Sequence, residues 1–285
     1  MRRAFAFAAV VVAAGLANVA ARSPSDSFRF VILGDRTGDT QRGVYERIWK
    51  ETATDDPAFV LTVGDTIQGL HDESAEAEWA QVTRLLAPYR RIALYLAPGN
   101  HDIWSENSEA LFRANAGHAP HYSFDYRQAH FTVLDNSRSE QFSSEELVFL
   151  EADLRAHAGQ TLKFIVSHRP SWVLDVFLGN PNFAVHRLAK KYGVQCVIAG
   201  HVHQMIRAEL DGVEYLSMPS AGGHLRASKK YEDGWFFAHT AVEVRGADVR
   251  MQVKEVSAPY GRGRVTNPRD WGKAGLVERA KGAGA

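Results

Sequence analysis

The stretch FRFVILGDRTG, residues 28–38, carries the pattern on which the fold prediction rests. Six residues rich in aromatic and branched side chains predict a buried strand, and the chain then enters Gly34 and Asp35 at once. Glycine permits a tight turn there, and a carboxylate just past a strand end lies where α/β sheets bind ligands. The question is whether other strands in the chain end in the same way.

Further apolar runs alternate with helical patterns along the first two hundred residues. The runs predict strands at residues 59–63, 92–96, 130–134, 162–166 and 196–198. Helices are expected at residues 40–52, 75–86, 143–158 and 181–192. In the third of these, Ser143 and Glu146 have the spacing of a capping box. This alternation predicts an α/β protein with a largely parallel sheet.

The pattern changes after Gly200. Strand-like runs are separated by hairpin signals at Asp211-Gly212 and Arg245-Gly246, so we expect antiparallel strands that add to a second sheet. From residue 257 onward the sequence is glycine-rich and charged, which predicts a loosely ordered C-terminal tail over residues 257–285.

Composition limits the class of protein and of partner. With 285 residues, 45% hydrophobic and 23% charged, the chain is of ordinary globular type, and residues 22–256 are expected to form one domain. Lysine plus arginine equals aspartate plus glutamate, 33 against 33, so nothing in the net charge attracts nucleic acid or an anionic membrane. The single cysteine, Cys196, lies in an apolar run and is expected to be a core residue.

The first residues have the features of an export signal. Arg2 and Arg3 precede an uncharged apolar run, and small residues at 19–21 suit cleavage, so residues 1–21 are predicted to be a signal peptide. A transmembrane anchor is the alternative, but the run is short and rich in alanine. We therefore expect a periplasmic or secreted protein with no stable membrane anchor after cleavage.

Polar side chains with metal-binding atoms follow the predicted strands. They are Asp35, Asp65, Asn100, His101, His168, His201 and His203. Because the carboxyl ends of parallel strands converge on one crevice, we expect these side chains to meet. Oxygen and nitrogen donors without thiolate suit manganese, iron or zinc, and a carboxylate can bridge two such ions in phosphoryl transfer.

The ordered set Gly-Asp, Gly-Asp, Gly-Asn-His-Asp, a lone histidine and Gly-His-x-His resembles the calcineurin-like metallophosphoesterases, over residues 28–256. The resemblance implies a two-sheet β-sandwich flanked by helices, in four α/β/β/α layers, and two divalent or trivalent metal ions. It also implies that Asp65 bridges the metals. Asn100, His168 and His201 would complete one site, and Asp35 and His203 would belong to the other.

The resemblance leaves His101 free of metal, to position a phosphoryl group and to stabilise or protonate the leaving oxygen. Asp102 would orient His101, or would serve as a helix cap or turn residue instead. Arg36 could contact a phosphate oxygen or be solvated. His224 could line the crevice mouth near the substrate or lie in a flexible turn.

Two positions depart from the family pattern. Many members have a histidine where this chain has Thr37, and the purple acid phosphatases have a tyrosine where it has Gln68. The site of Asp35 and His203, called the first metal site, should therefore bind its ion more weakly. The side-chain carbonyl oxygen of Gln68 is a further candidate ligand there. Thr37 is expected instead to cap a helix that starts near Asp39.

These observations together predict a metal-dependent hydrolase of a small phosphomonoester or phosphodiester, in which the metals activate the attacking water. The alternative, motivated by the depleted first site, is an exported protein that binds metal and phosphate with little or no turnover.

Overall fold

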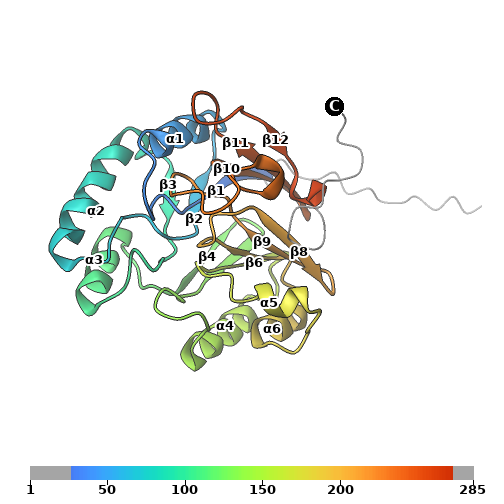
Figure 1. Ribbon diagram of the computed structural model, residues 1–285. Helices are drawn as coiled ribbons and strands as arrows, with labels where there is room; N and C mark the ends of the chain where they lie inside the picture. The colour runs from blue at the N-terminus through green and yellow to red at the C-terminus, as the bar shows by residue number, and fades with distance from the viewer. Residues whose placement is uncertain (1–26, 272–285) are drawn as a thin grey trace, which may run out of the picture.

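The computed structural model describes residues 27–271, and its strands form two sheets that pack face to face (Figure 1). The first sheet has the order β12-β11-β10-β1-β2-β3 and the second has the order β4-β5-β6-β7-β9-β8. The strands are β1 (Ser27–Leu33), β2 (Phe59–Thr62), β3 (Ala93–Tyr95), β4 (Tyr122–Tyr126), β5 (Ala129–Val133), β6 (Leu162–Val166), β7 (Cys196–Ala199), β8 (Ile206–Leu210), β9 (Val213–Ser217), β10 (Ala238–Arg245), β11 (Asp248–Glu255) and β12 (Val265–Thr266).

Helices cover the outer face of each sheet. They are α1 (Val44–Thr54), α2 (Asp72–Leu86), α3 (Glu106–Ala116), α4 (Ser144–Ala156), α5 (Val173–Phe177) and α6 (Ala184–Tyr192). The first three lie against the first sheet and the last three against the second, as Figure 1 shows. The predicted four-layer α/β/β/α sandwich is confirmed.

An aromatic core joins the two sheets. Phe30 and Phe59 of the first sheet stack with ring centroids 5.0 Å apart, and Phe131 of the second sheet meets Phe30 edge-on at 5.3 Å. All three side chains are fully buried. Burying rings of this size contributes much of the free energy that holds such layers together.

The predicted strands form, and β1, β2 and β3 pair in parallel, as do β5, β6 and β7. The antiparallel pairing predicted for the second half of the chain is confirmed for β8 with β9 and for β10 with β11. The predicted second sheet receives β8 and β9, although β9 pairs with β7 in parallel. The hairpin of β10 and β11 joins the first sheet instead, antiparallel to β1. Sequence periodicity identifies such strands, but it does not say which open sheet edge accepts them.

Two capping predictions need correction. The first helix, α1, begins at Val44 after Gly43, so Thr37 does not cap it. Ser143 does cap α4, because its hydroxyl accepts a hydrogen bond from Glu146 N at 3.2 Å. The carboxylate of Glu146 does not complete the capping box: it binds the His121 ring at 2.6 Å and accepts from Asp135 N at 2.9 Å.

The prediction of a loosely ordered tail is wrong for residues 257–271. Strand β12 pairs with β11, and Trp271 is only 6% exposed, with its ring 5.7 Å from Phe236 and 5.5 Å from Tyr231. A single buried aromatic residue at the end of a polar segment produces no hydrophobic periodicity, so the sequence pattern did not reveal it. The predicted signal peptide and residues 272–285 lie outside the described residues. Within residues 27–271, no helix has the length and apolar character needed to cross a bilayer.

Replacing Trp271 with alanine should lower the free energy of unfolding by about 3 kcal/mol, because it empties a buried aromatic site. Urea denaturation monitored by circular dichroism measures the change. Val265→Ala, at a side chain 56% exposed on neighbouring β12, is the matched control and should change stability by less than about 0.5 kcal/mol. Equal, small changes in both variants would contradict an anchoring role for Trp271.

Candidate metal centre

The predicted site residues gather where strands of both sheets end. Asp35 follows β1 and Asp65 follows β2, while His168 follows β6. Asn100 and His101 follow β3, and His201 and His203 follow β7. Asp35, Asp65, His168 and His203 are fully buried. The face-to-face packing of two sheets therefore brings together side chains that are far apart in the sequence.

The ligand atoms form two groups that share one carboxylate. Asp65, His168 and His201 offer atoms within 4.8 Å of one another, and so do Asp35, Asp65 and His203. The amide oxygen of Asn100 lies 3.0 Å from His168 Nε2. The sharing of Asp65 agrees with its expected bridging position.

Each buried aspartate divides its two oxygens between two tasks. Asp35 Oδ1 accepts a hydrogen bond from His201 N at 2.8 Å, and Asp65 Oδ1 accepts one from His101 N at 2.9 Å. The other oxygen of each carboxylate is buried without a hydrogen-bond partner among the described residues. One oxygen thus fastens a neighbouring loop, and the second is available to a ligand.

The backbone is bent sharply at the same positions. Asp35, Asp65, His201 and His203 have φ angles of 54°, 58°, 68° and 61°, in the left-handed region. Non-glycine residues rarely occupy this region, and each one costs of order 1–3 kcal/mol in strain. Such strain persists where the surrounding structure enforces it, as the hydrogen bonds of the two aspartates do here.

Two glycines leave the space that the carboxylates need. A Cβ on Gly200 would lie 2.4 Å from Asp35 Oδ2, and one on Gly99 would lie 2.3 Å from Asp65 Oδ1. Both distances are shorter than any real contact, so a side chain at either position would displace a candidate ligand.

Main-chain carbonyls orient two of the imidazoles. His168 Nδ1 donates to Val63 O and His203 Nδ1 donates to His224 O, each at 2.7 Å. Both rings therefore direct Nε2 into the site, as outer hydrogen bonds commonly arrange for metal-binding histidines. His224, predicted near the substrate, contributes its main-chain carbonyl, and its ring is half-buried.

Burial and neighbouring charges shift the pKa values of these candidate ligands. Burial raises the pKa of Asp35 to about 8, although His168 partly offsets it. Burial also lowers the pKa of His201 to about 3 and that of His203 to about 4, so both rings are neutral at pH 7. Burial opposes charge on His168 too, but Asp65 outweighs it and raises the pKa of His168 to about 9.

The residues present fit two metal ions. Imidazoles, an amide oxygen and unpartnered carboxylate oxygens are the donors that manganese, iron and zinc accept, and a metal ion would displace the proton that Asp65 favours on His168. A dication beside Asp35 would offset the cost of its burial and favour its charged form. Asp35 and His203 would hold one ion, and Asn100, His168 and His201 the other, with Asp65 between them.

Of the two roles predicted for Asp102, the contacts match that of a turn residue and not that of orienting His101. Its buried carboxylate accepts hydrogen bonds from Thr66 N at 2.8 Å, Ile67 N at 3.2 Å and Gly99 N at 2.9 Å. Burial and the neighbouring Asp65 charge raise its pKa to about 7. Asp102 therefore fastens the loop after β2 to the loop after β3, and the ring of His101 is held instead by the main-chain carbonyl of Gln68, at 2.5 Å from Nδ1.

The contacts exclude a cap by Thr37 and solvation of Arg36, and they give Gln68 a main-chain role. Thr37 is buried and donates its hydroxyl to Asp65 O at 3.3 Å. Arg36 is not solvated: it is 8% exposed, donates to Thr66 O at 3.2 Å and lies 5.5 Å from the centre of the Tyr45 ring. Gln68 is exposed, and its contact with the site is the carbonyl that accepts from His101.

Two arginines and one asparagine at the site were missed in the sequence. Arg169 lies with one guanidinium nitrogen 3.4 Å from His201 Nε2, and Arg226 approaches His203 Nε2 at 3.5 Å. The amide oxygen of Asn136 accepts from His168 N at 3.1 Å and Arg169 N at 3.0 Å. The sequence could have indicated Arg169, because it directly follows the predicted ligand His168. It could not have indicated Asn136 and Arg226, because their approach to the site depends on the paths of loops.

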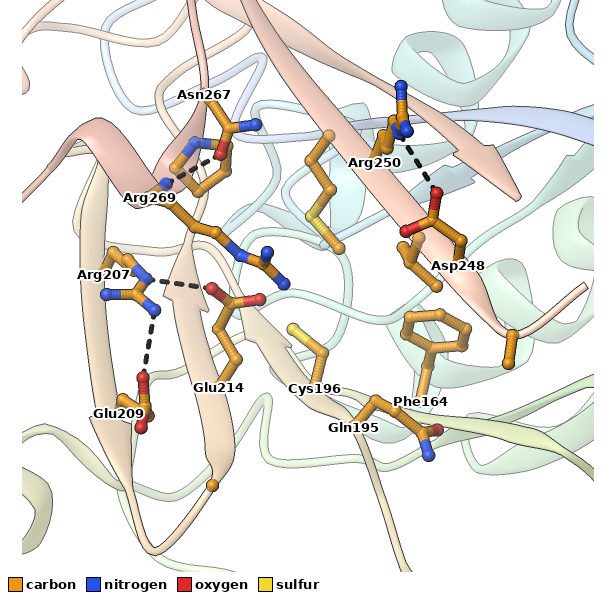
Figure 2. A pocket seen from close by; sticks show the side chains of 15 residues that line it. Phe164, Gln195, Cys196, Arg207, Glu209, Glu214, Asp248, Arg250, Asn267 and Arg269 are labelled. Atoms are coloured by element: carbon orange, nitrogen blue, oxygen red, sulfur yellow. Dashed lines mark hydrogen bonds and ion pairs between the residues drawn. The ribbon is translucent and has the colours of Figure 1, made fainter. Parts of the chain in front are cut away.

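A cavity of about 900 Å³ lies away from this centre (Figure 2). Figure 2 shows Arg207, Glu214, Arg250 and Arg269 around it, and Cys196, at the start of β7, lies at its floor. The metal ligands follow the opposite end of β7. Cys196 is buried and burial raises the pKa of its thiol well above the ordinary value, as expected for a core residue and not for a nucleophile.

Asp102→Asn should lower the free energy of unfolding of the metal-free protein by about 2 kcal/mol, because an amide cannot accept from all three backbone donors. Urea denaturation in the presence of a chelator measures this. Asp72→Asn is the control, since its exposed carboxylate also joins two segments, through Ser105 Oγ at 2.7 Å. A loss for Asp102→Asn no larger than for the control would show that Asp102 does not hold the loops together.

Comparison with known proteins agrees with the geometry. The chain is 21% identical over 238 residues to the 3′,5′-cyclic adenosine monophosphate phosphodiesterase CpdA of Haemophilus influenzae, covering 77% of this chain and 83% of that protein. Its fold is similar to that of the purple acid phosphatase PPD1 of yellow lupin, with a TM-score of 0.63, 15% identity and 85% of this chain covered. The chain spans about half of that phosphatase, 53% of its length.

GAP50, described as the anchor in the inner membrane complex of Plasmodium, also has a similar fold, with a TM-score of 0.59, 14% identity and 90% of each chain covered. At these identities, the two structural likenesses establish the fold alone. Residues 28–205 match the model of the calcineurin-like phosphoesterases, and the chain belongs to that family.

Proposed function

We propose that this protein hydrolyses a small phosphate ester, with a phosphodiester as the favoured substrate. The observation that carries the proposal is the pair of buried carboxylate oxygens, Asp35 Oδ2 and Asp65 Oδ2, without partners among the described residues. The neutral imidazoles of His201 and His203 lie beside Asp65 and Asp35 respectively. The similarity to a cyclic nucleotide phosphodiesterase supports the choice of a diester, since it extends over most of both chains.

Metal ions held by this ligand set would polarise a phosphoryl oxygen and activate a water molecule at neutral pH. We take the ions to be manganese, iron or zinc. The ion held by Asp35 and His203 would be bound more weakly than the other, because this chain has Thr37 where many family members have a histidine ligand.

We assign His101 to the leaving oxygen, which it would stabilise and protonate. The hydrogen bond from its Nδ1 to Gln68 O turns Nε2 toward the crevice. A Cβ built on Gly38 would lie 3.9 Å from that Nε2 and 3.8 Å from His203 Nε2, so the two nitrogens face the same small volume. A proton on His101 Nε2 would stabilise the charge on the leaving oxygen and then pass to it.

Arg169 and Arg226 supply positive charge at the rim. Arg169 is 16% exposed at its side chain and pairs with Glu140, which is 71% exposed. An anionic substrate would compete with Glu140 for this guanidinium and accept its hydrogen bonds in the planar geometry that arginine offers to phosphate.

Export is part of the proposal and rests on the basic opening and apolar run of residues 1–21.

His101→Ala should lower kcat by about 10²- to 10⁴-fold, because it removes the proton donor without removing a metal ligand. Hydrolysis of bis(p-nitrophenyl) phosphate and p-nitrophenyl phosphate, after chelation and reloading with manganese, zinc or iron, measures this. His71→Ala is the control, since His71 is 72% exposed and makes its ion pair with Glu73 on α2. If no metal gives turnover above His101→Ala while metal and phosphate still bind, the protein is a metal- and phosphate-binding protein.

Arg169→Met should raise KM for the aryl phosphates by about 10-fold, because it removes charged hydrogen bonds to the anion while its stem can still pack. Steady-state kinetics at fixed metal concentration give the value. Arg138→Met is the matched control: Arg138 also pairs with a glutamate, Glu109 at 3.1 Å, and should leave KM unchanged. An unchanged KM in Arg169→Met would exclude a substrate contact.

A further inference from the structure

The loop between β5 and α4 carries a carboxylate at the rim of the metal centre. The loop covers residues 134–143, and Glu140 lies on it with its side chain 71% exposed. The Glu140 carboxylate contacts Arg169 Nη1, and the same nitrogen lies 3.4 Å from His201 Nε2. A single guanidinium nitrogen therefore separates this negative charge from a candidate metal ligand.

The guanidinium of Arg169 is held in place by more than its ion pair. Its Nε and Nη2 donate to Ser137 O at 3.4 and 3.3 Å, so one edge of the group is fastened to the main chain. The Asn136 side chain fixes the backbone of Arg169, because its oxygen accepts from Arg169 N at 3.0 Å and its nitrogen donates to Arg169 O at 2.8 Å. Arg169 would therefore remain at the site without its contact with Glu140.

Contacts of a neighbouring loop residue keep Glu140 near the site. Arg138 donates to Ser105 O at 2.6 Å and pairs with Glu109 at 3.1 Å, which joins the loop to α3 and to the residue before it. These contacts do not involve the side chain of Glu140. When an anionic ligand displaces the carboxylate from Arg169, the negative charge therefore stays at the rim.

We propose that Glu140 determines substrate specificity at this centre by disfavouring doubly charged phosphomonoesters relative to singly charged phosphodiesters. This role rests on the proposed function and gives a physical cause for the choice of a diester. A fixed carboxylate repels an anionic ligand in proportion to the charge of that ligand. A phosphomonoester carries about −1.5 to −2 charges near neutral pH, whereas a diester carries a single one. The monoester therefore loses more binding free energy beside Glu140.

Two effects of Glu140 act on an ester that binds at this centre. Its carboxylate competes for Arg169 Nη1, which weakens the binding of any anion, whether singly or doubly charged. Its charge also repels the bound ester, and this repulsion is the part that discriminates between the two classes. Because the side chain is 71% exposed, water and salt screen the charge, and we expect a discrimination of about 3- to 10-fold.

An ion pair at this position can also serve as a brace that orients Arg169, and the two roles predict opposite results. Loss of a brace would leave the guanidinium less well placed and would raise KM for both classes of ester. Loss of a competitor would lower KM instead. The contacts of Arg169 with Ser137 and Asn136 favour the second role, because they already hold its guanidinium and its backbone.

Steady-state kinetics of Glu140→Gln with p-nitrophenyl phosphate and bis(p-nitrophenyl) phosphate, on the full chain reloaded with manganese, test this role. KM should fall for both esters, and kcat/KM should rise about 3- to 10-fold more for the monoester than for the diester. Glu140→Asp keeps the charge and should stay close to the wild-type ratio. Glu151→Gln is the matched control, since Glu151 is also exposed and pairs with a cation, Lys191 at 2.6 Å, and it should change neither value.

Calorimetric binding of two compounds without an ester bond separates this role from the proposed function. Methylphosphonate is doubly charged above its second pKa, and dimethylphosphinate is singly charged. Glu140→Gln should tighten the first about 3- to 10-fold more than the second, and added salt should shrink the difference. That result without turnover of either ester would contradict the proposed function and support the role of Glu140. An unchanged ratio of the two affinities, or a KM that rises for both esters, would overturn the role.

Discussion

The burial of two carboxylates that each use only one oxygen is the constraint on which the rest of the site depends. Asp35 and Asp65 are fully removed from solvent, and each fastens the backbone of a distant loop through Oδ1. Leaving the other oxygen without a partner costs about 1–3 kcal/mol in a protein interior. A fold optimised for stability alone would pair these atoms, so their burial without a hydrogen-bond partner among the described residues indicates a ligand of positive charge.

Stability comes from elsewhere in the molecule. Strained backbone at Asp35, Asp65, His201 and His203 adds to the cost of the open oxygens. The aromatic core between the sheets, of which Phe30, Phe59, Phe131 and Phe164 are part, offsets it by burying large apolar rings. Because both sheets contribute ligands, the same packing that stabilises the sandwich also sets the distance between the two halves of the site.

Short-range periodicity predicted the strands, and the general geometry of parallel strands predicted the convergence of seven polar residues. The four layers were predicted from the resemblance to the calcineurin-like metallophosphoesterases. The sequence did not predict what Asp102 contacts, since three backbone donors from two loops define its role. The anchoring of Trp271 and the approach of Arg226 were missed for a similar reason. Each depends on how an irregular segment returns to the domain, and local pattern carries no information about that path.

Counting the partners of each carboxylate oxygen separates ligands from braces among aspartates that look alike in sequence. Asp102 stands two residues from Asn100, yet both of its oxygens accept backbone N–H donors, so its carboxylate joins the two loops and, unlike Asp35 and Asp65, has no oxygen without a partner. Asp35 and Asp65 each keep one oxygen free. The distinction is physical, because a buried oxygen that already accepts two hydrogen bonds cannot also bind a cation without losing at least one of them.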